Sequence, residues 1–283
     1  MTDQLRCKKA VIAVAGFGTR RLPITKAVEK SMLPIGDKPV IDYIVDDCIR
    51  AGITDIILIV GEQSQQVRTY YGHNAKLEDH LDETGKTKML DQIQQISGKA
   101  NFTFITQDST QPYGTSVPLW LAREELGNEP FLYMYGDNIF YNADGSSAVA
   151  TFVEQAAQAN TAGAMMAVPV PQELVSHYGI VATRKQGDQE LYEKIVEKPK
   201  PEEAPSNLNN AGCFLMMPDI MPYVERSITH APQHEKYFID ALNWYVQDGK
   251  DIAVIRTDAE FIDCGNVQGW LHANNRIVGP NSN

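Results

Sequence analysis

The sequence predicts an α/β protein with a mostly parallel mixed sheet, helices on both faces and a strand-rich insertion in its later half. Short apolar runs alternate with helical patterns through the first 160 residues, as they do in parallel sheets that helices cover on both sides. From about residue 161 the strands become denser. The chain has 283 residues, of which 43% are hydrophobic and 22% charged, so it can bury a large core.

Six short apolar runs predict the buried strands of this sheet. They span residues 10–15, 55–60, 102–106, 131–135, 163–168 and 253–256. The 3.6-residue period of the apolar side chains predicts helices between and after the early strands. These helices span residues 39–51, 117–126 and 148–159.

The later half of the chain has a different pattern. Two further strands are predicted at residues 179–183 and 191–196, and the Pro- and Glu-rich stretch 198–205 is typical of an exposed loop. Helices return at residues 237–247 and 267–277. We interpret residues 1–283 as one compact domain that contains this strand-rich insertion.

The composition excludes several classes of partner. A formal net charge of −11 disfavours nonspecific binding to nucleic acid or to anionic membranes. No apolar run approaches the roughly 18 residues that span a bilayer. The four cysteines contain no C-x-x-C pair, and scattered thiols of this kind favour a reducing compartment. We therefore expect a cytoplasmic protein that binds neither nucleic acid nor membrane.

The loop after the first strand has the composition of a phosphate site. It reads Ala-Gly-Phe-Gly-Thr-Arg-Arg over residues 15–21. Ligands of open parallel sheets bind at the carboxyl ends of the strands, and glycines let backbone N–H groups approach a phosphate closely. Arg20 and Arg21 add guanidinium groups that are suited to oxyanions. A glycine turn with two surface arginines is the alternative.

Two common phosphate motifs do not fit this loop. The Walker A pattern is absent, and the dinucleotide fingerprint G-x-G-x-x-G lacks its third glycine, because Arg21 stands there. Lys26, Lys30 and Lys38 follow, so that residues 20–38 contain five cations in a chain of strongly negative charge. This density indicates a ligand with several phosphates.

The run AGFGTRRLPITKAVEKSMLPIGDKPVIDYIV, residues 15–45, resembles the signature of the sugar-1-phosphate nucleotidyltransferases. It is most similar to the bacterial UTP–glucose-1-phosphate uridylyltransferases, with their pattern AGxGTRxLPxTKxxPKEMLPxxDKP. Weaker similarities follow in order, at Gly136-Asp137, Tyr178-Gly179-Ile180 and Asp263-Cys264-Gly265. The resemblance implies a Rossmann-like nucleotide-diphospho-sugar transferase fold, in which residues 1–160 bind mainly the nucleotide and residues 161–283 mainly the sugar.

The activity that the resemblance implies is UTP + glucose 1-phosphate → UDP-glucose + pyrophosphate, with Mg²⁺ as cofactor and a homodimer or homotetramer as the assembly. The chemistry suits the residues. The attacking phosphate oxygen is already mostly ionised, because the second pKa of a phosphate monoester is about 6. Catalysis should therefore come from positioning and from charge neutralisation, and needs no strong general base.

The resemblance also implies a role for individual residues. The nucleotide would be held by Ala15, Gly16, Gly18, Thr19, Gln107 and Gly114, of which the last two read the uracil. The catalytic cations would be Arg20 at the departing phosphates, Lys30 at the transferred phosphate and Lys198 at the sugar phosphate. The sugar would contact Gly179, Glu197 and Asn210.

Asp137 and Asp263 are the candidate metal ligands. Each follows an apolar run, so each should lie at the carboxyl end of a strand. Two carboxylates together with substrate phosphates are a usual way to hold Mg²⁺. For either aspartate alone, a turn or a cap is the alternative role.

The sequence departs from the family pattern at three places. Glu29 and Ser31 stand where the pattern has the proline and the glutamate of PKEM. Residues 112–116 read PYGTS where GLGHA is usual, and residues 234–241 read HEKYFIDA where GEIQLTDA is usual. Two alternative functions stay open: a thymidylyltransferase or other sugar-1-phosphate nucleotidyltransferase, and a regulatory subunit that binds nucleotide-sugars without turnover.

Overall fold

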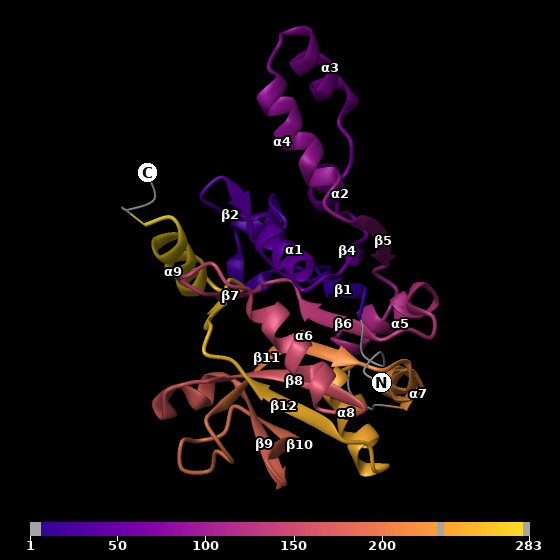
Figure 1. The fold of residues 1–283 in the computed structure, drawn as a ribbon, viewed down its shortest axis with the longest axis vertical. Helices are drawn as coiled ribbons and strands as arrows, with labels where there is room; N and C mark the ends of the chain where they lie inside the picture. The colour runs from indigo at the N-terminus through magenta and orange to yellow at the C-terminus, as the bar shows by residue number, and fades with distance from the viewer. Residues whose placement is uncertain (1–6, 231–234, 280–283) are drawn as a thin grey trace.

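A nine-stranded sheet forms the centre of the protein in a computed structural model that describes residues 7–230 and 235–279 (Figure 1). His234 belongs to segment 234–241, which differs from the family pattern, and it lies outside these residues. The strands of the sheet are β1 (Lys9–Ala13), β4 (Asp55–Gly61), β5 (Asn101–Gln107), β6 (Phe131–Tyr135), β8 (Gly163–Pro169), β9 (Gly179–Gln186), β10 (Gln189–Glu197), β11 (Leu208–Met216) and β12 (Ile252–Arg256). Their order is β5-β4-β1-β6-β11-β8-β12-β10-β9.

The sheet is parallel in its first half and mixed in its second. β5, β4, β1 and β6 run parallel, with Ala13 opposite both Ile59 and Tyr135. β11 runs antiparallel to β6 and β8, while β9 and β10 form an antiparallel hairpin at the far edge. The predicted α/β class and its later strand-rich part are therefore confirmed. The loops after β1, β4, β5 and β6 meet at one edge, because these strands share one direction.

Helices cover both faces of the sheet. One face carries α1 (Val40–Arg50) and α6 (Ala148–Gln158), and the other carries α5 (Ser116–Leu126), α7 (Met221–His230) and α8 (Phe238–Gln247). β1 shows why both are needed: Ala10 and Ile12 pack into the first core, whereas Val11 packs into the second. A fully buried valine or isoleucine stabilises the fold by roughly 1.5–3 kcal/mol.

A small two-stranded sheet brings distant parts of the chain together. β7 (Asn138–Tyr141) pairs antiparallel with β13 (Glu260–Asp263), and Asn138 lies opposite Asp263. Asp137 and Asp263 therefore become neighbours although they are 126 positions apart in sequence. α9 (Val267–Ile277) follows and packs on β13 and on the short strand β2 (Pro34–Ile35), which pairs with β3 (Lys38–Pro39).

Three helices that the sequence pattern did not predict lie within residues 62–100. They are α2 (Gln66–Tyr71), α3 (Ala75–Glu83) and α4 (Thr87–Ser97), and the α3–α4 hairpin projects away from the sheet (Figure 1). After α4, the ammonium of Lys99 lies 2.6 Å from the carboxylate of Asp42 and 2.8 Å from that of Asp46, both on α1. This ion cluster fixes the base of the projection.

None of the helices within residues 7–230 and 235–279 combines the length and the apolarity that crossing a membrane requires.

Candidate functional site

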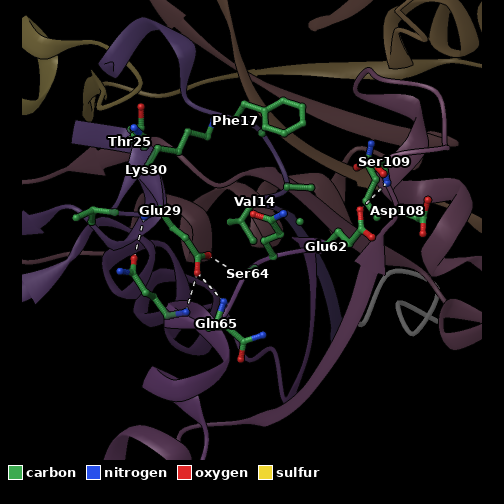
Figure 2. A pocket seen from close by; sticks show the side chains of 18 of the residues that line it. Val14, Phe17, Thr25, Glu29, Lys30, Glu62, Ser64, Gln65, Asp108 and Ser109 are labelled. Carbon is green, nitrogen blue, oxygen red and sulfur yellow. Dashed lines mark hydrogen bonds between the residues drawn. The ribbon is translucent and has the colours of Figure 1, made fainter. Parts of the chain in front are cut away.

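A pocket of about 630 Å³ opens at the carboxyl edge of the parallel strands (Figure 2). Its walls come from the loops after β1, β4 and β5 and from the segment that leads to Lys30. The lining segments are residues 14–17, 25–30, 61–66 and 107–109, together with Gln111 and Tyr113. Of the predicted site residues, Ala15, Gly16, Lys30 and Gln107 line this pocket.

The loop after β1 folds back on itself next to the pocket. Gly18 has a φ of 64°, in the left-handed region that favours glycine, and its carbonyl accepts a hydrogen bond of 2.8 Å from the hydroxyl of Thr25. Thr19 then begins a 3₁₀ turn that also contains Arg20. Gly18 and Thr19 shape this turn, whereas the backbone of Gly16 faces the pocket.

Two side chains converge over Gly16. A Cβ at this position would lie 3.4 Å from both the ammonium of Lys30 and the hydroxyl of Tyr113. The ring of Tyr113 also lies near that of Phe17, with the ring centroids 6.2 Å apart and the planes 17° from parallel. The pocket therefore has an amine and two exposed aromatic rings beside the glycine loop.

Lys30 and Asp137 form a mostly buried ion pair. The Nζ of Lys30 lies 2.8 Å from the Oδ2 of Asp137, and the two side chains are 17% and 13% exposed. Burial opposes both charged forms, but their mutual attraction outweighs it, so that the pKa of Asp137 is lowered and the pKa of Lys30 is raised. Both groups are therefore ionised at neutral pH.

Asp137 and Asp263 face one another across Gly265. A Cβ on Gly265 would lie 2.7 Å from Oδ2 of Asp137, 2.8 Å from Oδ1 of Asp263 and 2.8 Å from Nη2 of Arg20. Arg20 Nη1 is 3.5 Å from Asp263 Oδ2, and the amide of Cys264 donates to the carbonyl of Asp137 at 2.9 Å. Two carboxylates and a guanidinium therefore surround one small space.

Two carboxylates alone make an incomplete metal site. Among the described residues, no group of three or more His, Cys, Asp and Glu side chains could hold an ion. An ion between Asp137 and Asp263 would need further oxygen ligands from substrate phosphates and water. Hard oxygen donors with several open positions suit Mg²⁺.

Arg21 and Lys38 do not face the site, which corrects the expectation from the charge pattern. The Arg21 side chain is buried, donates to the carbonyls of Cys264 at 3.3 Å and Asn266 at 2.8 Å, and stacks on Trp270. Lys38 pairs with Asp46. Arg21 therefore attaches the glycine loop to α9, and the cations that remain around the site are Arg20, Lys26 and Lys30.

The two segments that depart from the family pattern form one unit. The amide of Lys236 donates to the carbonyl of Tyr113 at 2.7 Å, and the amide of Ser116 donates to the carbonyl of Lys236 at 2.8 Å. Gly114 lies against this backbone, where a Cβ would be 2.3 Å from the nitrogen of Lys236. The Nε2 of Gln107 donates to the carbonyl of Pro112 at 3.2 Å, so Gln107 fixes the same loop.

The predicted sugar residues gather on β9, β10 and β11. Glu197 ends β10 beside Gly179, the first residue of β9, where a Cβ would lie 2.8 Å from Oε1 of Glu197. Asn210, on β11, accepts a hydrogen bond of 3.1 Å from the amide of Gly212. Lys198 is exposed and has a φ of 46°. Holding a residue other than glycine in this conformation costs about 1–3 kcal/mol.

Several residues of the site have no role predicted from the sequence. Glu29 and the loop 61–66 line the pocket. Tyr135 lies between the two halves: burial raises the pKa of its hydroxyl, and the charges of Glu197 and Asp137 add to the rise. The rule of strand ends could have found loop 61–66, because it follows the predicted strand 55–60.

Residues 9–278 match the nucleotidyl transferase family. A UTP–glucose-1-phosphate uridylyltransferase of Streptococcus pneumoniae is 39% identical over 80% of this chain and 75% of its own length. That of Bacillus subtilis is 36% identical over 78% of this chain and 74% of its own length.

Solved structures show the same similarity across the fold. The UTP-bound UGPase of Acinetobacter baumannii superposes with a TM-score of 0.85 at 30% identity, covering 96% of this chain and 93% of that one. A UDP-glucose pyrophosphorylase in complex with UDP-glucose superposes with a TM-score of 0.80 at 28% identity, covering 96% and 98%.

Proposed function

The chain belongs to the nucleotidyl transferase family, and we propose that it is a UTP–glucose-1-phosphate uridylyltransferase that makes UDP-glucose and pyrophosphate. The observation that supports this most strongly is the ring of Lys30, Arg20, Asp137 and Asp263 beside a pocket of nucleotide size. These groups are what the transfer of one polyanion onto another requires.

The nucleotide is bound mainly by residues 1–160. The backbone of Ala15, Gly16 and Gly18, together with Thr19, holds the phosphates, while Gln107 and the Gly114 loop contact the base. In support of this assignment, Ala15, Gly16 and Gln107 line the pocket, and the Gln107 amide bonds to the loop that contains Gly114.

Asp137 and Asp263 fit a magnesium ion. Their carboxylate oxygens point at the same space, where the missing side chain of Gly265 leaves room. When bound there, Mg²⁺ would neutralise charge on the substrate phosphates. The raised pKa of Lys30 keeps its Nζ protonated beside this space, so Lys30 acts as a fixed positive charge and not as a base.

The transfer itself is a direct displacement. An oxygen of the sugar phosphate attacks the α-phosphorus of UTP, the bond from that phosphorus to the bridging oxygen of the β-phosphate breaks, and pyrophosphate leaves with the electron pair. Lys30 stabilises the charge on the transferred phosphate and Arg20 the charge on the leaving group. Positioning and charge neutralisation account for the rate, because the nucleophile is already ionised.

The sugar phosphate is bound mainly by residues 161–283. Glu197 accepts hydrogen bonds from sugar hydroxyls beside Gly179, Asn210 adds a contact, and Lys198 binds the phosphate. The strained backbone of Lys198 supports this role, since such conformations persist where the surrounding fold holds a functional residue in place.

Charge, exposed apolar side chains and cysteines support the partners and the location that we propose. A net charge of −11 supports small-molecule substrates and no nucleic acid. Val267 and Leu271 are 46% and 43% exposed on α9 and offer an apolar face to a second copy, in a homodimer or homotetramer. Four free, buried cysteines support a cytoplasmic location.

Pyrophosphate release tests the proposal. Purified protein with Mg²⁺ and glucose 1-phosphate is assayed against UTP, dTTP, CTP, GTP and ATP separately, and release with UTP alone is expected. A preference for dTTP would assign the chain to a thymidylyltransferase, since residues 112–116 differ from the usual base-side loop. Silence with every nucleotide and several sugar phosphates would refute catalysis and leave a nucleotide-sugar-binding subunit.

A further inference from the structure

The carboxylate of Glu29 is held by three donors from the loop after β4. It accepts hydrogen bonds from the hydroxyl of Ser64 at 2.5 Å and from the amides of Gln65 at 2.9 Å and Gln66 at 2.7 Å (Figure 2). Hydrogen bonds to a charged acceptor are roughly twice as strong as neutral ones. Glu29 is therefore a wall residue of the pocket whose charge is already satisfied within the protein.

Gln66 returns two bonds to the same segment. Its Oε1 accepts from the amide of Glu29 at 2.8 Å, and its Nε2 donates to the carbonyl of Ala27 at 3.2 Å. Five hydrogen bonds thus join residues 27–29 to residues 64–66. We call this set the Glu29 clamp.

Lys30 is the next residue after the clamp. Its ammonium must reach over Gly16 and contact Asp137 at 2.8 Å, so the position of its backbone matters. The segment that approaches Lys30 is a succession of short turns, with 3₁₀ turns at residues 24–26 and 30–32 and no regular helix between them. Such a segment has little rigidity of its own, and the clamp holds it immediately before Lys30.

The family pattern has proline where this chain has Glu29. The backbone of Glu29 has a φ of −59° and a ψ of 134°. A proline ring fixes φ near −65°, so the conformation is the one that proline would impose. In this chain, side-chain hydrogen bonds stabilise a conformation that proline would fix covalently.

We propose that Glu29 is a positioning residue that acts through Lys30, holding the lysine at the transferred phosphate by clamping its loop to residues 64–66. The inference rests on the proposed function, because it assigns Lys30 a task in the reaction. It goes beyond that function because it assigns Glu29 a role in positioning Lys30 that requires no contact between Glu29 and substrate.

The kinetic test compares two substitutions of Glu29. Glu29→Ala is expected to lower kcat about 10- to 100-fold with KM for UTP changed less than threefold, since misplacement by about 1 Å can cost 10²-fold. Glu29→Pro should recover most of the loss. Its recovery is incomplete because proline keeps the φ of residue 29 but removes the three hydrogen bonds to the carboxylate and the N–H that donates to Gln66. A Glu29→Ala enzyme with the kcat of the wild type, or one whose loss lies only in KM for UTP, would overturn the proposal.

A double mutant with Lys30 distinguishes a residue that acts through Lys30 from one that affects turnover independently of it. In a Lys30→Met background, Glu29→Ala should reduce the residual rate no further. A further reduction by the same factor as in the wild-type background would show that Glu29 acts independently of Lys30, and would refute the proposal. Glu78→Ala is the matched control: Glu78 likewise accepts a backbone amide, that of Asn74, at 2.9 Å, but lies in the projecting helices.

Hydrogen exchange measures the effect of the clamp on backbone stability, independently of catalysis. Backbone amides of residues 26–32 should exchange faster in Glu29→Ala than in the wild type and in Glu29→Pro, while the circular dichroism of all three stays the same. Unchanged exchange in Glu29→Ala would refute the clamp. A wild type without activity but with this exchange pattern would refute the proposed function and leave the clamp supported.

Discussion

Replacing Gly265 by alanine tests the arrangement of Asp137 and Asp263 with a single methyl group. The new Cβ would lie 2.7 Å from Asp137 Oδ2 and 2.8 Å from Asp263 Oδ1. Non-bonded heavy atoms are comfortable at about 3.5 Å, so each carboxylate would have to retreat by roughly 0.7 Å. The backbone of Gly265 is not in the left-handed region, so alanine adds no backbone strain.

A displacement of this size should disrupt the coordination of Mg²⁺ but should hardly change the stability of the fold. Mg²⁺ requires near-octahedral ligands at about 2.0–2.1 Å, so a displacement of roughly 0.7 Å disrupts the site. We expect kcat/KM to fall about 100-fold or more and the Mg²⁺ concentration for half-maximal rate to rise. The unfolding free energy should change by less than about 1 kcal/mol, because the carboxylate ends and the Arg20 guanidinium can move.

The assay is pyrophosphate release against Mg²⁺ concentration, with thermal unfolding measured alongside. Gly98→Ala is the control, since Gly98 is exposed at the end of α4 and does not line the pocket. A Gly265→Ala protein with wild-type turnover and unchanged Mg²⁺ dependence would refute the account of the carboxylate pair.

Two further substitutions test the electrostatics. Lys30→Ala should fold but lose turnover by about 10²- to 10³-fold. The pKa of Asp137 should rise, because the strongest charge that opposes the effect of burial is then gone. An unchanged rate or an unchanged carboxyl titration by NMR would contradict this. Burial raises the pKa of Asp47 from 3.8 to about 6, so its ionisation weakens the fold as pH rises between these values. Asp47→Asn should therefore raise the unfolding free energy by up to about 3 kcal/mol at pH 7 and by almost nothing near pH 3.5; denaturant titrations that show equal effects at both pH values would contradict it.

Apolar periodicity was sufficient for most of the sheet and its covering helices. The run 131–135 coincides with β6, and the helix predicted at 267–277 coincides with α9. Helix α4 went unpredicted although Met89, Leu90, Ile93 and Ile96 recur at helical spacing; these side chains stay partly exposed, because α4 projects from the sheet and buries none of its residues completely. The apolar pattern fails for β11, where polar Asn209 and Asn210 interrupt a buried strand that pairs with both halves of the sheet.

Within the site, strand positions could be predicted from the sequence, but the directions of single side chains could not. Strand ends place Asp137 at the functional edge, and this is visible in the sequence. The direction of neighbouring side chains is not: Arg20 and Arg21 share one 3₁₀ turn, yet Arg20 is 64% exposed beside Asp263 and Arg21 is buried under α9. The Glu29 clamp could not be predicted from the sequence either, because it joins segments about 35 residues apart in the chain.

Isotope exchange tests most directly the claim that the chain only positions its substrates and supplies no nucleophile. Radiolabelled pyrophosphate is incubated with the protein, Mg²⁺ and UTP, with or without glucose 1-phosphate. Direct displacement predicts label in UTP only when the sugar phosphate is present. Label in UTP without any sugar phosphate would mean that a side chain accepts the uridylyl group, and would contradict the account.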